Sequence, residues 1–237
     1  DYVYAGDMQG NLFRFDITDS DHDNWTVQKI FQAKYKPGTP DELDQPITTQ
    51  PIAISHPTES GFIIIFGTGS YNRTSDSTSE EIQSIYGIWD RLSPELIDKT
   101  ELQQQKYTNV SDSLGLVRTL TNNPVDYSVV GGKKGWYIDL DSPAAGFPDG
   151  SPAEIPGERA VRNIQLRGGL GFVNSVFPQV AGSCVDRAGG AILSFCPDTG
   201  GSECFNNRTI FDLNNDGQFN DDLSTGEIAA GIILLNP

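Results

Sequence analysis

Short runs of alternating apolar and polar residues dominate this chain and predict β-strands. In residues 12–16, a leucine and an arginine alternate with two phenylalanines, as expected for a strand with two different faces. Residues 62–66 are apolar throughout, which predicts a strand covered on both faces. The other predicted strands are residues 3–6, 25–33, 51–55, 84–89, 116–120, 135–140, 164–166, 171–177, 191–195 and 228–234.

One short helix is predicted at residues 93–105. Ser93 can cap its first turn, and Pro94 suits the first helical position. Glu95 favours the positive end of the helix dipole.

Polar, glycine-rich segments separate the strands. Residues 56–61 predict the turn of a hairpin. Residues 131–135 lack the spacing of a phosphate-binding loop and predict another hairpin turn. Two long loops are expected at residues 72–81 and 141–157.

The strands and a weak internal repeat indicate an all-β fold. Residues 189–200 echo the second half of the hairpin at residues 2–16. Many short strands with such echoes favour a β-propeller, with a sandwich as the alternative. We expect residues 1–237 to form part of a single propeller domain, with a partial set of roughly four or five blades, or fewer with large insertions.

Composition and net charge exclude several classes of function. The chain is 37% hydrophobic, enough for a core, and its net charge is −16. This acidity argues against a nucleic-acid partner and fits a protein secreted into a calcium-containing medium. No apolar run reaches the roughly 18 residues of a membrane helix. The chain begins within a predicted strand and without a signal peptide, so we expect a fragment of a longer protein.

The candidate chemistry lies in an acidic loop at residues 212–222. Oxygen-bearing side chains alternate before Gly217, as in the first half of a calcium loop. An EF-hand would then require a glutamate where Leu223 stands, so the loop must close earlier, through Asn220, Asp221 or Asp222. The alternative is a metal-free turn rich in Asn and Asp. The predicted Ca²⁺ ligands are Asp212, Asn214, Asp216, the Gln218 carbonyl, Asn220 and Asp222.

Three cysteines match no zinc pattern. Cys196 and Cys204 bracket a turn-rich loop that a disulfide could close, and buried free thiols are the alternative. Cys184 would then be unpaired or paired outside this chain.

Other polar and aromatic groups have simpler interpretations. The acidic stretch at residues 19–24 lacks the glycine of a calcium loop, so we expect a solvated loop. His56 is expected in a surface turn. Trp25, Trp89 and Trp136 are expected in the core rather than on a carbohydrate-binding platform. The sequence contains no nucleophile motif, so we expect no enzymatic activity. The alternatives are a quinoprotein-like dehydrogenase and a calcium-stabilised extracellular structural or binding domain.

A set of motifs resembles the PilY1/PilC family of type IV pilus proteins. In order, they occur at residues 4–16, 66–71, 84–90, 135–140, 157–159 and 166–169, and together they span nearly the whole chain. The resemblance implies a quinoprotein-like C-terminal β-propeller with a calcium site, in which Asn220 stands where the family usually has Asp.

The resemblance also implies a function. It indicates a bacterial, extracellular or cell-surface protein at the pilus tip or in pilus assembly. Such a protein would support adhesion and twitching motility, and calcium would tune pilus extension against retraction. Its expected partners are minor pilins or a host or abiotic surface. The adhesive N-terminal region of the family has no counterpart in this chain.

Overall fold

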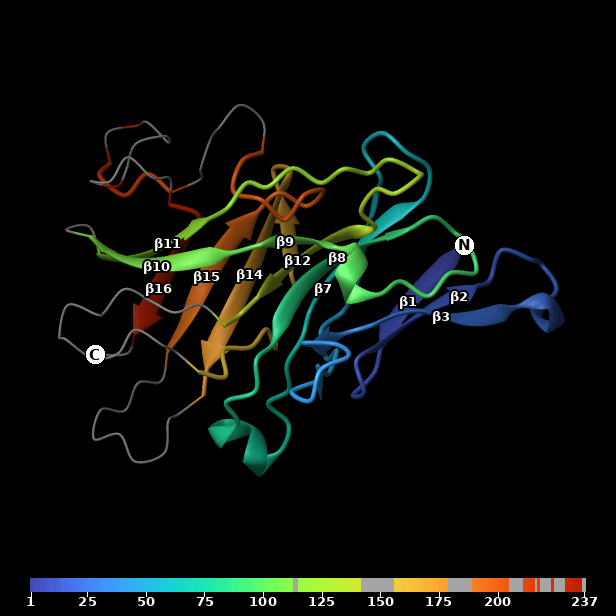
Figure 1. Cartoon of the computed structure of the whole chain (residues 1–237), viewed down its shortest axis with the longest axis horizontal. Helices are drawn as coiled ribbons and strands as arrows, with labels where there is room; N and C mark the ends of the chain where they lie inside the picture. The colour runs from blue at the N-terminus through green and yellow to red at the C-terminus, as the bar shows by residue number, and fades with distance from the viewer. Residues whose placement is uncertain are drawn as a thin grey trace.

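The computed structural model describes residues 1–112, 115–141, 156–178, 189–204, 211–215, 217, 223 and 229–235. Over these residues the chain forms strands and three short 3₁₀ helices, with no α-helix. The strands make three larger sheets that lie side by side from the N-terminal to the C-terminal part (Figure 1), and one two-stranded ribbon. The ribbon consists of β4 (Lys34–Tyr35) and β5 (Leu43–Asp44). No helix in this part of the chain is long and apolar enough to cross a membrane.

The first sheet is antiparallel and has two different faces, as its alternating sequence predicts. It contains β1 (Tyr2–Gly6), β2 (Asn11–Asp16) and β3 (Thr26–Gln32), in that order. Leu12 and Phe31 are fully buried on one face. Val3, Phe15 and Val27 lie directly opposite one another on the other face and remain 48%, 36% and 59% exposed.

The second sheet is covered on both faces. Its order is β6 (Ile52–Ser55), β7 (Phe62–Gly67), β8 (Ser84–Asp90), β12 (Gly135–Asp139) and β9 (Gln103–Gln105). Ile64 and Phe66 pack into one core with Leu12 of the first sheet. Ile63 and Ile65 belong to a second core. The prediction that residues 62–66 are covered on both faces is therefore confirmed.

The third sheet packs against the second through that second core. Its order is β10 (Tyr107–Asp112), β11 (Gly115–Leu120), β16 (Gly231–Leu235), β15 (Gly189–Phe195), β14 (Leu170–Phe177) and β13 (Gln165–Arg167). Val173, Leu193 and Phe195 meet Ile63 and Ile65 there. Sheets stacked face to face in chain order are the arrangement of propeller blades. The all-β, partial-propeller prediction is confirmed, and the described residues form three larger sheets, which agrees with the expected alternative of fewer than four blades.

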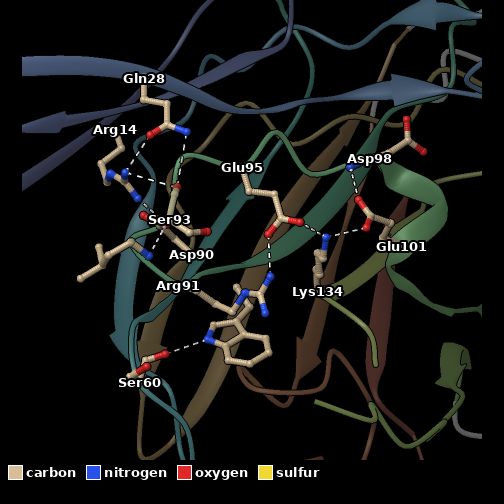
Figure 2. Close-up of polar contacts among 12 residues, drawn as sticks. Arg14, Gln28, Ser60, Asp90, Arg91, Ser93, Glu95, Asp98, Glu101 and Lys134 are labelled. Carbon is tan, nitrogen blue, oxygen red and sulfur yellow. Dashed lines mark hydrogen bonds and ion pairs between the residues drawn. The ribbon is translucent and has the colours of Figure 1, made fainter. Parts of the chain in front are cut away.

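The predicted helix at residues 93–105 is wrong. Leu92 has a φ of 60°, and Ile97 donates its backbone N–H to Ile30 of the first sheet. Asp98, not Ser93, caps the only helical turn here, the 3₁₀ turn Lys99–Glu101 (Figure 2). The end of the segment, Gln103–Gln105, is extended and pairs with β12 as β9. Contacts with two sheets override the local helix signals.

Buried charges hold the first two sheets together (Figure 2). Arg14 Nη1 lies 2.6 Å from Asp90 Oδ1, and Arg14 Nη2 donates a hydrogen bond to Gln28 Oε1 at 2.8 Å. Tyr4 donates its hydroxyl to the other Asp90 oxygen at 2.8 Å. Arg14 and Asp90 are both buried, so this pair fixes the position of β8 against β1 and β2.

Two smaller predictions are corrected. Trp89 and Trp136 lie in the core, but Trp25 is 50% exposed and donates its indole N–H to the Asp19 carbonyl. Its position just before β3 places it at the exposed end of the first sheet. Residues 131–135 include a turn, but β12, which follows it, pairs with β8 and β9, so this is not a hairpin turn.

Candidate functional site

The acidic loop lies in the connection between two neighbouring antiparallel strands, β15 and β16. Asp212 accepts a hydrogen bond from the Gly217 backbone N–H at 2.9 Å, which closes a tight turn. Asn215 and Gly217 have φ values of 60° and 82°, a region that asparagine and glycine adopt most readily. Nothing lies within 4 Å of the place where a Gly217 Cβ would stand, so the backbone conformation, not space, favours glycine there.

The described half of the loop fits a hard cation. Asp212 and Asn214 offer carboxylate and amide oxygens, the donors that Ca²⁺ prefers. The Gly217 hydrogen bond fixes the Asp212 carboxylate relative to the turn. The other predicted ligands, Asp216, Gln218, Asn220 and Asp222, and the alternative Asp221, lie outside the described residues, as does Cys184.

The second acidic stretch forms an exposed turn between β2 and β3. Asp19 and Asp21 accept hydrogen bonds from backbone N–H groups two residues on, at 2.8 and 3.1 Å. The ligand atoms of Asp21, His22 and Asp23 lie within 4.8 Å of one another, but all three residues are exposed. The hydrogen bonds and exposure agree with the predicted solvated loop.

His56 is in a turn, as predicted, but it is buried rather than on the surface, because two rings of other segments cover it. Its ring lies 4.6 Å from the Trp89 ring and 4.4 Å from the Tyr127 ring, centroid to centroid. Nδ1 accepts hydrogen bonds from the backbone N–H groups of Thr58 and Glu59. Burial lowers the pKa of His56, and the nearby Glu59 and Asp198 charges oppose this only in part. The geometry holds a neutral imidazole that shapes the hairpin turn.

A disulfide joins Cys196 and Cys204, with 5.3 Å between their Cα atoms, which confirms the predicted bridge. Three successive carbonyls of the enclosed loop accept hydrogen bonds from side chains elsewhere. Trp136 donates to Pro197 at 3.1 Å, Tyr127 to Asp198, and Gln105 to Thr199 at 3.0 Å. The loop is therefore held in one position against the second sheet and the segment that precedes β12.

This loop borders a cavity of about 470 Å³ that the sequence did not reveal. Strands β6 and β13 supply Ile54 and Leu166 to its wall, and the loop supplies Asp198, Glu203 and the disulfide. The only sequence signal for it is the pair of cysteines around a turn-rich loop. The strands on the opposite wall meet it only in the folded chain.

Glu158 and Arg159, in the motif at residues 157–159, are buried and hydrogen-bonded within the fold. Arg118 pairs with both oxygens of Glu158, at 2.6 and 2.7 Å, and Tyr107 donates its hydroxyl to Glu158 at 3.0 Å. Arg159 donates to the carbonyls of Ser70 and Ser79. This segment therefore links the second and third sheets and is a structural element, not an open polar site.

Comparison with known proteins gives consistent matches. The family model described as the PilY1 beta-propeller domain matches residues 1–141. The type IV pilus biogenesis factor PilY1 of Pseudomonas aeruginosa PAO1 is 30% identical over 251 residues, covering 92% of this chain and 20% of the relative. A PilY1 homolog of Xylella fastidiosa is 30% identical over 195 residues, covering 78% of this chain and 12% of the relative.

A solved structure is also similar. The crystal structure of the Pseudomonas aeruginosa PilY1 C-terminal domain matches with a TM-score of 0.73 and 25% identity, covering 98% of this chain and 52% of that chain. The chain thus spans about a fifth of the length of the first curated relative and about half of the solved domain.

Proposed function

Because this chain belongs to the PilY1 β-propeller family, we propose that it is a calcium-binding propeller portion of a protein that supports type IV pilus assembly. The relatives named as type IV pilus biogenesis factors support this role. We place the protein outside the bacterial cell, associated with the pilus. Control of pilus retraction, twitching motility and surface adhesion are the further activities that we expect of the whole protein.

The single observation that carries the calcium proposal is the turn closed by Asp212 and Gly217. It positions a carboxylate at the start of a run of alternating oxygen side chains. The four acids of residues 212–222 would repel one another in a metal-free loop. Ca²⁺ would be held by Asp212 and Asn214 together with the later oxygens of the loop.

The bound ion would neutralise these carboxylates and fix the β15–β16 connection. Strand β16 lies in the middle of the third sheet, between β11 and β15. An ordered connection would therefore keep one surface of that sheet in a constant shape. We propose that this surface contacts a pilus component such as a minor pilin, or the host or abiotic surface to which the pilus attaches.

Isothermal titration calorimetry with Ca²⁺ tests the site. We expect saturable heat for the wild-type chain and its loss in Asp212→Ala, because position 1 contributes a charged ligand. Asp41→Ala, which removes one acid from an exposed loop, is the control and should keep the heat. Equal heats in wild type and Asp212→Ala would remove the loop as the binding site.

The pilus role is tested in cells. A strain that carries Asp212→Ala in the intact gene product should assemble fewer pili or lose calcium-dependent twitching, and Asp41→Ala should not. We also expect a non-catalytic protein. Turnover of alcohols or sugars with added quinone and an artificial electron acceptor would overturn that expectation.

A further inference from the structure

Two sheet edges meet at the cavity beside the disulfide. Strand β6 is the first strand of the second sheet, and β13 is the last strand of the third. Within the described part of the chain, each pairs with one neighbour only, β7 and β14 respectively. Their other sides therefore carry backbone N–H and C=O groups that can pair with an added strand.

The starts of the two strands lie close together. The Gln50 backbone N–H donates to Asn163 Oδ1 at 2.9 Å, just before β6 and β13 begin. Farther along, Ile54 and Leu166 both line the cavity and pack partly into the core beneath it. The result is a groove with an apolar floor between the two strand edges.

The part of this groove that the disulfide loop supplies is acidic and held in place. The Asp198 carboxylate lies within 4.8 Å of the sulfurs of Cys196 and Cys204, and Glu203 also lines the cavity. Glu203 accepts a hydrogen bond from Asn122 at 3.0 Å. Among the described lysines, arginines and histidines, none forms an ion pair with Asp198 or Glu203. Two carboxylates on a rigid wall beside an apolar floor favour a cationic, partly apolar partner.

We propose that this groove binds an extended polypeptide segment, which pairs with the open edge of β6, places an apolar side chain between Ile54 and Leu166, and sets a lysine or arginine beside Asp198 and Glu203. Strand addition supplies backbone hydrogen bonds, and the pocket and charges supply selectivity. The cavity volume of about 470 Å³ is ample for one side chain of this kind. None of the described residues of the acidic loop lines this cavity, so we expect this binding not to depend on calcium.

The test uses three fluorescently labelled nine-residue peptides. The first alternates valine and threonine and carries two lysines. The second has glutamates in place of the lysines, and the third repeats the first with alternate backbone nitrogens methylated. By fluorescence anisotropy on the purified chain, we expect the lysine peptide to bind at least tenfold more tightly than either of the others. The loss on methylation follows because a methylated nitrogen cannot donate to the strand edge.

Matched variants locate the site. Asp198→Asn with Glu203→Gln should weaken the lysine peptide at least fivefold while keeping side-chain size. Asp41→Asn with Glu80→Gln removes the same charge elsewhere and should change affinity less than twofold. Leu166→Ala should weaken binding, whereas Leu96→Ala, at a leucine 56% exposed outside the groove, should not. Hydrogen exchange should slow at residues 52–55 when the peptide is bound.

Several results would overturn the proposal. Equal affinity for the lysine and glutamate peptides would show that Asp198 and Glu203 do not select a cationic side chain. Equal affinity for the methylated peptide would exclude strand pairing. An equal loss in the two charge variants would assign the binding to overall charge rather than to this groove.

Discussion

At the scale of single residues, His56 shows how burial makes a common side chain sensitive to pH. Its Nδ1 accepts two backbone hydrogen bonds, so that nitrogen cannot take a proton without losing them. The pKa of His56 is lowered by burial in the folded state. The unfolded chain therefore binds a proton first as the pH falls. The stability that the neutral imidazole provides is present above the unfolded pKa of about 6.5 and declines as the pH falls from there toward the lowered folded pKa.

We therefore predict that the free energy of unfolding falls between pH 7.5 and 5, and that His56→Phe removes part of this dependence. Urea unfolding at the two pH values measures it. His22→Gln changes an exposed histidine and is the control. If both variants keep the wild-type pH dependence, His56 is not its source.

The Arg118–Glu158 pair leads to a second prediction. Both side chains are 1% exposed, so Arg118→Met leaves a buried carboxylate without its cation. We expect a loss of ~3–5 kcal/mol in the free energy of unfolding, measured by urea denaturation. Arg91→Met breaks a more exposed pair with Glu95 and should cost about 1 kcal/mol or less. Similar losses in the two variants would show that burial does not set the cost.

At the scale of elements, the disulfide loop joins a covalent constraint to three side-chain hydrogen bonds. The bridge closes a short loop with a sequence separation of 8, so we predict that Cys196→Ser with Cys204→Ser lowers the free energy of unfolding by about 2–3 kcal/mol. Urea unfolding with and without a reducing agent measures this. The agent should destabilise the wild type but not the double variant. A wild type unaffected by reduction would contradict the prediction.

Elements were predictable from the sequence where the pattern of apolar residues within a single strand shows which of its faces are buried. The alternation at residues 12–16 predicts a strand with two different faces, and the apolar run at 62–66 predicts a strand covered on both faces. Both predictions are confirmed. The helix predicted at 93–105 does not form because Ile97 is hydrogen-bonded to the first sheet and the β9 residues pair with β12 in the second sheet. His56 and Trp25 were misplaced for a similar reason, since the rings that cover one and the open face that exposes the other belong to the tertiary structure. The groove could not be predicted, because its walls come from strands more than 100 residues apart.

At the scale of the whole molecule, a net charge of −16 opposes compaction. Sodium chloride should therefore raise the melting temperature by screening, since the Debye length shortens to about 8 Å at 0.15 M. A specific calcium site adds a separate gain, because an ion that binds only the folded state stabilises it by mass action. The two effects separate when calcium is added at low millimolar concentration in 0.15 M salt, where it hardly changes the ionic strength.

Under these conditions we predict that Ca²⁺ at 100 times its Kd raises the melting temperature by about 5–10 °C in the wild type. Asp212→Ala should lose this gain, while both proteins respond alike to sodium chloride. Mg²⁺ should do less, because it demands a smaller octahedral site and gives up its waters reluctantly. Differential scanning calorimetry provides the measurement. Equal shifts with Mg²⁺ and Ca²⁺, or an unchanged shift in Asp212→Ala, would attribute the effect to general charge neutralisation, because screening does not distinguish between ions of the same charge.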